Sequence, residues 1–464
     1  MARKRTFEAI ELSANPWLRR LLVSRWPQWI LTVLALAGFL YAILAGLLGT
    51  PVGNRNLAIT MVWIAWWALL ILILVPLGGR AWCSICPIPI AGEWLQHGGL
   101  MNSDGRQARG LRRRWPRRLR NLWLQNAGFL ALGLTSTVIL TSPLVSALVL
   151  AALLAVALIV SAVFERRTFC RYVCPVGGFI GIYSLAAPLA LRVKDPAVCA
   201  QHPAKECFRG SEHGHGCPWL VYPGTLQRNA GCGLCLECLR TCPLDNVSLV
   251  LRSPGADLTT EGKKPPLTLD EAFKAFIMLS TALIYSAVLF GPVAAWKEAA
   301  YSLGSPDWFI YALACVALAL LLIPGLYAVA SWLGRILAGA EKPAWRDVFL
   351  RSTAGLVPLG LAFWVAFSLS FFLINNTYVL STLSDPLGLG WDLIGTAALS
   401  WLPTLSGFLP GLQVAVLLLG LTWSTSVTLK AIPNMTSARK RLLAAAPVLA
   451  ANMVVTICLG WLYL

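Results

Sequence analysis

Histidine is scarce in this chain of 464 residues, which has only four: His97, His202, His213 and His215. None falls inside a long apolar run, so a bis-histidine haem within a bilayer is excluded. No C-x-x-C-H sequence occurs, which excludes an attached c-type haem. The chain also lacks a glycine-rich dinucleotide fingerprint and a Walker sequence. We therefore expect neither haem nor nucleotide chemistry.

Charged residues are also few, at 12% of the chain, and only 20 residues are acidic against 38 that are basic. Hydrophobic residues make up 57% and the mean hydropathy is +0.69. These values exclude a soluble globular class and indicate an integral membrane protein. The net charge of +18 is better explained by basic cytoplasmic loops than by nucleic-acid binding. We expect contact with membrane lipid and none with nucleic acid.

Nine apolar segments are long enough to cross a bilayer core, for which about 20 residues are needed. They are residues 28–49, 57–78, 121–141, 144–164, 272–296, 307–330, 350–374, 408–429 and 442–463. If the N-terminus is cytoplasmic, 34 of the 38 basic residues fall in the segments expected inside, which are 1–27, 79–120, 165–271, 331–349 and 430–441. The charge distribution therefore predicts a multi-pass protein of the inner (cytoplasmic) membrane, with its C-terminus outside.

We predict an all-α integral membrane protein in three regions. Residues 1–194 form two helical hairpins. Residues 195–271 form a cysteine-rich cytoplasmic insert with a polar surface linker at 253–266, and residues 272–464 form a five-helix bundle. Residues 381–407 mix apolar and turn-forming residues. Their simplest interpretation is an interfacial helix on the outer surface, and the alternative is a re-entrant or partner-docking element.

Eleven of the thirteen cysteines lie between residues 83 and 242. The strongest motif is Cys232-Gly-Leu-Cys235-Leu-Glu-Cys238-Leu-Arg-Thr-Cys242-Pro243. This C-x2-C-x2-C-x3-C-P run holds 4Fe-4S clusters in bacterial ferredoxins. Structural zinc sites favour separated C-x2-C pairs and fit the run poorly. We therefore predict a ferredoxin-like insert with two iron–sulfur clusters.

The ligand sets of two such clusters are interlocked, because the fourth cysteine of each run binds the other cluster. A second Cys-Pro pair marks Cys217 as the ligand that crosses over. The predicted ligands of the first cluster are Cys217, Cys232, Cys235 and Cys238.

The second cluster receives Cys242 in return, together with Cys199 and Cys207, which leaves it one ligand short. His202 stands where a C-x2-C spacing would place the missing ligand. Imidazole can replace thiolate on iron, and the reduction potential then rises. The alternatives are a surface histidine beside a three-cysteine (3Fe-4S) cluster, or a ligand from outside. Nearby, Asn246 could donate a hydrogen bond to sulfur or fix a turn.

Two of the apolar segments are followed by similar sequences, Arg80-Ala-Trp-Cys83-Ser-Ile-Cys86-Pro87 and Arg167-Thr-Phe-Cys170-Arg-Tyr-Val-Cys174-Pro175. Proline ends the regular helix there and exposes amides that can donate to sulfur. We expect a duplicated hairpin that brings Cys83, Cys86, Cys170 and Cys174 to the cytoplasmic rim of the membrane. They would form a third iron–sulfur, metal or dithiol site, and the alternative is structural thiols.

Glu93, Trp94 and His97 follow the first cysteine pair, near the expected inner interface. A carboxylate and an imidazole could accept protons from a quinol headgroup there. A polar turn at the interface is the simpler explanation.

At the cysteines the chain resembles the membrane polyferredoxins of the NapH and NosR type, a group that includes the CcoG-like membrane iron–sulfur proteins. Their hallmarks are C-x3-C-P motifs at helix ends and a cytoplasmic two-cluster segment. Cys170 and Cys174 match the first hallmark fully, whereas Cys83 and Cys86 have one residue fewer between them. The resemblance covers about residues 30–250, and the C-terminal helices have no counterpart in it.

The resemblance implies electron transfer between these clusters and the quinone pool or an extracytoplasmic redox partner. We identify no catalytic residue, and interpret the chain as the electron-transfer subunit of a membrane oxidoreductase complex with unidentified partner subunits. A stand-alone metal-ion reductase and a redox-sensing transporter are the alternatives.

Overall fold

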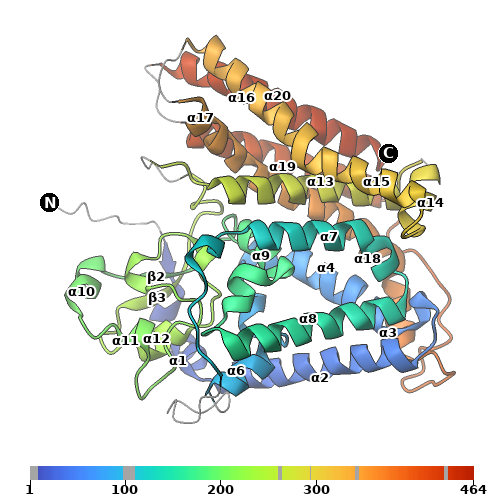
Figure 1. Cartoon of the computed structure of the whole chain (residues 1–464), viewed down its shortest axis with the longest axis horizontal. Coiled ribbons are helices and arrows are strands. Elements are labelled where there is room, and N and C mark those ends of the chain that lie inside the picture. Colours follow the sequence, from blue (N-terminus) through green and yellow to red (C-terminus); the bar gives the residue numbers. More distant parts are fainter. Residues whose placement is uncertain (1–8, 98–109, 260–263, 293, 340–343, 433–436) are drawn as a thin grey trace. The chain divides into compact units, whose positions relative to one another are not determined.

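The computed structural model describes residues 9–97, 110–259, 264–292, 294–339, 344–432 and 437–464 (Figure 1). The chain separates into two compact units. Unit 1 is drawn from residues 1–41, 73–125 and 150–257, and unit 2 from residues 42–72, 126–149 and 258–464. Each unit is described by itself below. The predicted division into three regions stays a prediction.

Eight helices in the described ranges are long and apolar enough to span a membrane, and the chain is a multi-pass membrane protein. These are Trp26–Leu48, Leu57–Gly78, Pro143–Val163, Leu269–Leu289, Pro306–Leu337, Trp345–Ser384, Leu409–Ala431 and Ala438–Trp461. They confirm eight of the nine predicted segments. The ninth forms α7 (Trp123–Ile139), whose 17 residues are at the lower limit for crossing a bilayer.

Unit 1 contains a three-stranded antiparallel sheet that the all-α prediction did not include. Strand β3 (Val247–Leu251) lies between β1 (Ile10–Glu11) and β2 (Leu189–Val193), with Val193 opposite Val247. The alternation of apolar residues in β2 and β3 is too short to be recognised among the surrounding helical segments. One strand comes from the N-terminal segment, so residues 10–11 fold with the insert.

The helices of unit 1 are mostly short, and several begin with a proline, which suits the first helical turn. Figure 1 shows α10, α11 and α12 around strands β2 and β3. The helices are α1 (Pro16–Val23), part of α2 (Trp26–Leu48), α5 (Val75–Gly78), α6 (Ile90–His97), part of α8 (Pro143–Val163), α9 (Pro175–Tyr183), α10 (Pro196–Gln201), α11 (Glu206–Arg209) and α12 (Glu237–Thr241). A π-helical turn, Phe169–Val173, precedes α9.

A small apolar core lies between the sheet and α12 and includes two of the cysteines. Leu191, Val247 and Leu249 of the sheet pack with Leu239, Cys207 and Cys238. Leu12 and Leu22 of the N-terminal segment cover its edge. The predicted ligand loops are thus supported by packing on one side.

The expected surface linker at 253–266 is partly buried. Asp257 is 1% exposed and forms ion pairs with Arg192, at 3.1 Å, and with Arg252. The backbone amide of Asn229 donates a hydrogen bond to the same carboxylate at 2.7 Å. A buried carboxylate with these partners fixes residues 253–257 to the insert, so that part of the prediction is wrong. Residues 260–263 lie outside the described part of the chain.

Unit 2 is a helical bundle with an aromatic centre. Its longer helices are α13 (Leu269–Leu289), α15 (Pro306–Ala317), α16 (Ile323–Leu337), α18 (Leu356–Ser384), α19 (Leu409–Ala431) and α20 (Ala438–Trp461), with the short helices α3 (Leu57–Ile59), α4 (Trp67–Leu69), α14 (Ala294–Tyr301) and α17 (Trp345–Ser352). Helices α16 and α20 run side by side (Figure 1). Trp364 is fully buried, makes edge contacts with Trp67, Phe129 and Tyr285, and donates to the Met278 carbonyl at 3.0 Å.

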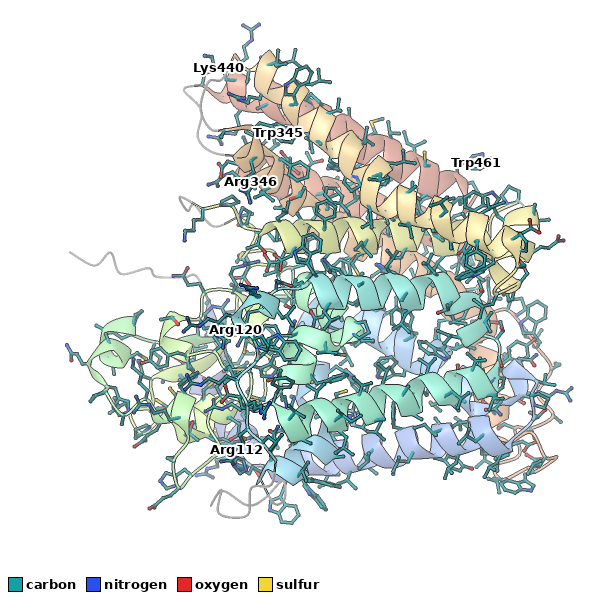
Figure 2. All side chains as sticks on the ribbon, in the orientation of Figure 1. Arg112, Arg120, Trp345, Arg346, Lys440 and Trp461 are labelled. Atoms are coloured by element: carbon teal, nitrogen blue, oxygen red, sulfur yellow. The ribbon has the colours of Figure 1, made fainter. Side chains whose placement is uncertain are left out.

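Basic residues of unit 2 gather at one end of its bundle. Figure 2 shows Arg346 and Lys440 at that end and Trp461 at the opposite end of α20. These two residues belong to the segments 331–349 and 430–441, which were both predicted to be cytoplasmic. Their position at a common end supports the predicted order of the spans, whereas the orientation of the chain in a membrane stays a prediction.

The prediction of an interfacial helix at 381–407 is wrong. Helix α18 continues to Ser384, and residues 385–408 form irregular structure that folds back along it. The Asp385 carboxylate accepts hydrogen bonds from the backbone amides of Leu389 and Gly390, at 2.9 and 2.8 Å. The Trp401 indole donates a hydrogen bond to the Ile374 carbonyl. Aspartate, proline and four glycines favour such turns over a helix.

Candidate functional site

The four thiols predicted for the first cluster belong to unit 1 and act electrostatically on one another. Burial raises the pKa of the Cys232 thiol to about 11, and a charge on Cys217 would raise it further. Cys217 acts in the same direction on Cys235 and Cys238, whose pKa values are raised first by burial. Thiols that act on one another in this way, three of them on a single loop, are the type of donor that an iron–sulfur cluster uses, and their ligation of a cluster stays a prediction.

Backbone amides point to several of these sulfurs. The backbone amide two residues after the cysteine acts to lower the pKa of Cys232 and of Cys235, and in the rim motifs that of Cys86 and of Cys174, against the larger effect of burial. Hydrogen bonds to sulfur stabilise the thiolate form and tune the potential of a bound cluster. The prediction that the Cys-Pro turns expose such amides is confirmed at Cys174, where the Gly177 amide lies 3.2 Å from Sγ.

The loop between Cys232 and Cys238 is held in an unusual backbone conformation. Leu234 and Leu236 both have positive φ values, 49° and 63°. The left-handed region costs a residue other than glycine about 1–2 kcal/mol. Such residues persist where surrounding contacts determine the conformation, and they gather at ligand-binding sites. Here they turn the chain so that the amides face the sulfurs.

The three cysteines predicted for the second cluster also lie together. Burial, with the neighbouring Cys242 and Cys199 thiols, raises the pKa of the Cys207 thiol to about 12. Asn246 holds two of the three sulfurs, since its side-chain amide donates to Cys199 Sγ at 3.2 Å and its backbone amide to Cys242 Sγ at 3.4 Å. Asn246 thus donates to sulfur, one of the two roles considered for it.

His202 ends helix α10, three residues after Cys199. Its Nε2 is buried and has no hydrogen-bond partner. A buried imidazole nitrogen without a hydrogen-bond partner could serve as the fourth ligand that the second cluster lacks. Its ligation of the second cluster stays a prediction.

The four rim cysteines, two from each hairpin, form a third group. Burial raises the pKa of the Cys170 thiol. A negative charge on Cys174, Cys86 or Cys83 would raise it further. Burial raises the pKa of Cys174 to about 11. Cys83, Cys170 and Cys174 are 6–8% exposed. The two pairs thus act on each other electrostatically, whereas the shared site and its occupant stay predictions.

Two arginines of the repeated motif cross between the hairpins. Arg167, from the second hairpin, donates to the Cys83 carbonyl and forms an ion pair with Glu93 of the first. Arg80, from the first hairpin, lies against Gly181 on α9 of the second. Arg167 therefore bonds to the cysteine turn of the first hairpin, and Arg80 packs against the helix that follows the second cysteine pair. Their identical place in the two motifs was visible in the sequence, but their exchange was not predicted.

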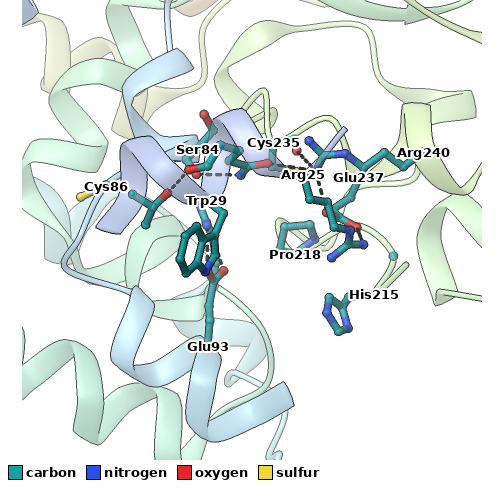
Figure 3. Close-up of a pocket in the computed structure, with 14 residues that line it drawn as sticks. Arg25, Trp29, Ser84, Cys86, Glu93, His215, Pro218, Cys235, Glu237 and Arg240 are labelled. Carbon is teal, nitrogen blue, oxygen red and sulfur yellow. Dashed lines mark hydrogen bonds and ion pairs between the residues drawn. The ribbon is translucent and has the colours of Figure 1, made fainter. Parts of the chain in front are cut away.

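A pocket lies between the rim group and the first insert group, with Cys86 and Cys235 both in its wall. It encloses about 700 Å³, part of it open to solvent. Figure 3 shows Trp29 next to Glu93 on one side, and Glu237 and His215 on the other. The pocket is lined by Arg25, Gln28, Trp29, Thr32, Ser84, Cys86, Glu93, Arg167, His215, Gly216, Pro218, Cys235, Glu237 and Arg240.

Charged side chains of the pocket are fixed in ion pairs. Glu93 accepts two hydrogen bonds from Arg167, one of them at 2.9 Å. Glu237 pairs with Arg25 at 3.0 Å and with Arg240 at 2.9 Å. Glu93 was considered from the sequence as a proton acceptor for a quinol headgroup, with a polar interface turn as the simpler explanation, whereas the contribution of Arg25 and Trp29, from the N-terminal segment, was not predicted. No local motif marks these two residues.

In the described ranges, no group of three or more histidine, cysteine, aspartate and glutamate side chains could hold a metal ion. The fit to iron–sulfur clusters rests on the chemistry of the donors. The insert and rim groups consist of thiols that act electrostatically on one another, and backbone amides are directed at their sulfurs. Thiolates of a 4Fe-4S cluster bind four different irons, which suits grouped thiols.

Residues 59–118 and 146–192 match the family model described as "4Fe-4S binding domain". The matched segments contain the four rim cysteines and end before the cysteines of the insert. The chain is also similar to the protein YccM of Escherichia coli, which is named for a proposed role in electron transport, with 27% identity over 101 residues. That region is 21% of this chain and 26% of the relative, so the chain spans about a quarter of the relative's length. No solved structure matches.

Proposed function

On the premise that the chain is similar to a membrane-type 4Fe-4S electron-transfer family, we propose that it relays electrons across the cytoplasmic face of the inner membrane. The electrons would pass between the quinone pool and a cytoplasmic redox partner. The observation that carries the proposal is the pocket that has Cys86 of the rim group and Cys235 of the first insert group in its wall.

The thiols of the three groups would hold the clusters. Clusters of this type, when bound, supply one-electron transfer. We assign one cluster to the rim cysteines, because the matched 4Fe-4S domain covers them. Two clusters are assigned to the insert, with the ligands predicted above. In this arrangement Cys217 and Cys242 interlock the two insert sites.

The pocket suits a quinol headgroup. It includes Trp29 and Thr32 in the first turns of α2, the helix that continues as an apolar span. Tryptophan is enriched where a span meets the membrane surface, which is the depth of a quinone ring. A quinol releases two protons with its two electrons. The Glu93 carboxylate, oriented by Arg167, and His215 are placed in the wall to receive them.

Replacing Glu93 by glutamine should lower the rate of quinol-driven cluster reduction by at least about tenfold, because a positioned proton acceptor contributes about 10²–10⁴-fold. Reduction by dithionite, which needs no proton acceptor in the pocket, should be unchanged. Stopped-flow absorbance on the purified protein measures both rates.

Glu212→Gln is the control, since Glu212 is exposed in the loop of the same insert. It should keep the wild-type rate with both reductants. Equal quinol-driven rates in wild type and Glu93→Gln would contradict the assignment of the pocket. Loss of the dithionite reaction as well would show that Glu93 acts by stabilising the rim turns.

Membership in a complex is a separate part of the proposal. Exposed apolar side chains in α15, α16 and α20, among them Leu313, Val329 and Ile457, can contact lipid or other subunits. Isolation with stoichiometric partner subunits would support a complex subunit, and isolation alone would support the stand-alone reductase.

A further inference from the structure

Arg80 is a buried cation between two of the thiol groups. Its side chain is 4% exposed, and it acts electrostatically on Cys83, Cys170 and Cys174 of the rim group and on Cys232 of the insert. The positive charge of this guanidinium acts to lower the pKa values of Cys174 and Cys232, whereas burial raises them. One charge therefore acts on both groups at once.

The Arg80 guanidinium stacks on a buried indole. Its central carbon lies 4.7 Å from the centre of the Trp219 ring, and Trp219 is 1% exposed. Arg80 Nε and Nη1 are buried without a hydrogen-bond partner, as is Trp219 Nε1. Unsatisfied buried donors are costly, and a buried guanidinium without a carboxylate is more so. These unpaired N–H groups of Arg80 and Trp219 could donate hydrogen bonds to an anionic acceptor such as the sulfur of a cluster.

Two glycines make room for this stack. A Cβ atom at Gly181 would lie 2.0 Å from Arg80 Nη2, and one at Gly233 would lie 1.8 Å from Trp219 Nε1. Gly181 is on α9, which follows the rim cysteines, and Gly233 is inside the insert motif. The space for the Arg80–Trp219 pair is thus built from both cysteine regions.

We propose that Arg80 is a positioning residue shared by two clusters, which raises the reduction potentials of the rim cluster and of the first insert cluster together. A cation between them stabilises the more negative reduced state of each, and the stack on Trp219 holds it in place. The inference rests on the proposed function, since it requires both groups to hold clusters.

The test is an EPR-monitored redox titration of the intact protein. Arg80→Met should make both clusters harder to reduce, by about tenfold or more in each reduction equilibrium constant, or about 59 mV for a one-electron couple. Arg192→Gln is the matched control, because Arg192, whose side chain is 14% exposed, also acts on Cys232 but is held by Asp257 in the sheet region. It should shift the insert cluster alone.

Gly181→Ala provides a second variant that removes no charge and no ligand. Its methyl group should displace the guanidinium and lower both potentials while the iron content stays at the wild-type value. Unchanged potentials in Arg80→Met or in Gly181→Ala, or a shift of one cluster alone, would overturn the proposal. Loss of iron from both variants, with retention in Arg192→Gln, would overturn it in favour of a structural role. A wild-type protein without two titrating signals would instead refute the proposed function.

Discussion

Replacing Cys235 by alanine is expected to remove one cluster and about four irons per chain. Cys235 is 7% exposed, and Cys217 and the Glu237 amide both act on its sulfur. No other thiol of that group can take its place, because the same loop fixes Cys232 and Cys238. One EPR signal of the reduced protein should disappear, and the remaining signals should keep their potentials. Iron analysis and low-temperature EPR measure the two effects.

Cys315 and Cys458 supply the matched controls, since each is a lone cysteine in a helix of unit 2. Their alanine variants should keep the full iron content and every signal. The ligand assignment would be contradicted if Cys235→Ala kept its iron, or if Cys315→Ala lost as much. Loss of transport with unaltered electron flux in Cys235→Ala would favour the redox-sensing transporter.

The second large effect is expected in the rim group, where the iron losses of two single variants should not add in the double variant. Cys83 and Cys170 come from different hairpins but act electrostatically on each other. If they hold one cluster together, Cys83→Ala and Cys170→Ala should each remove about four irons, and the double variant should remove no more than either alone. Iron and acid-labile sulfide are measured in all three variants, with the insert signals as an internal reference.

Two independent sites would behave differently. If each cysteine pair bound its own metal, or formed a dithiol, the losses would add in the double variant or would involve no sulfide. That result would contradict a shared rim cluster, and it would support the metal-ion reductase alternative.

The cysteine motifs could be recognised from the sequence, because iron–sulfur ligands are spaced by local turns, whereas their grouping into ligand sets stays a prediction. Cys232 to Cys242 lie in one run, and proline marks the turns at Cys86 and Cys174. The membrane-spanning helices were also predictable, because a helix that crosses the bilayer needs an apolar segment of a minimum length. Eight of the nine are found, and α7 is the short one.

Contacts between distant segments were not predictable. Arg25 pairs with Glu237, and Glu11 accepts from Ser248, although each pair is separated by more than 200 residues. No periodicity or motif marks such partners. Residues 385–408 were misassigned because their apolar side chains lie within turns, whose amides bond to Asp385 instead of forming a helix.

The central claim is that three thiol groups hold three clusters, and the iron and sulfide content of the anaerobically purified wild-type chain tests it most directly. Three cubane clusters give about twelve irons per chain, or about eleven if the second is a 3Fe-4S cluster, with nearly equal sulfide. About eight irons would mean that one of the three groups holds no cluster, which would contradict this claim. Fewer than about six irons, or zinc in their place, would contradict the account.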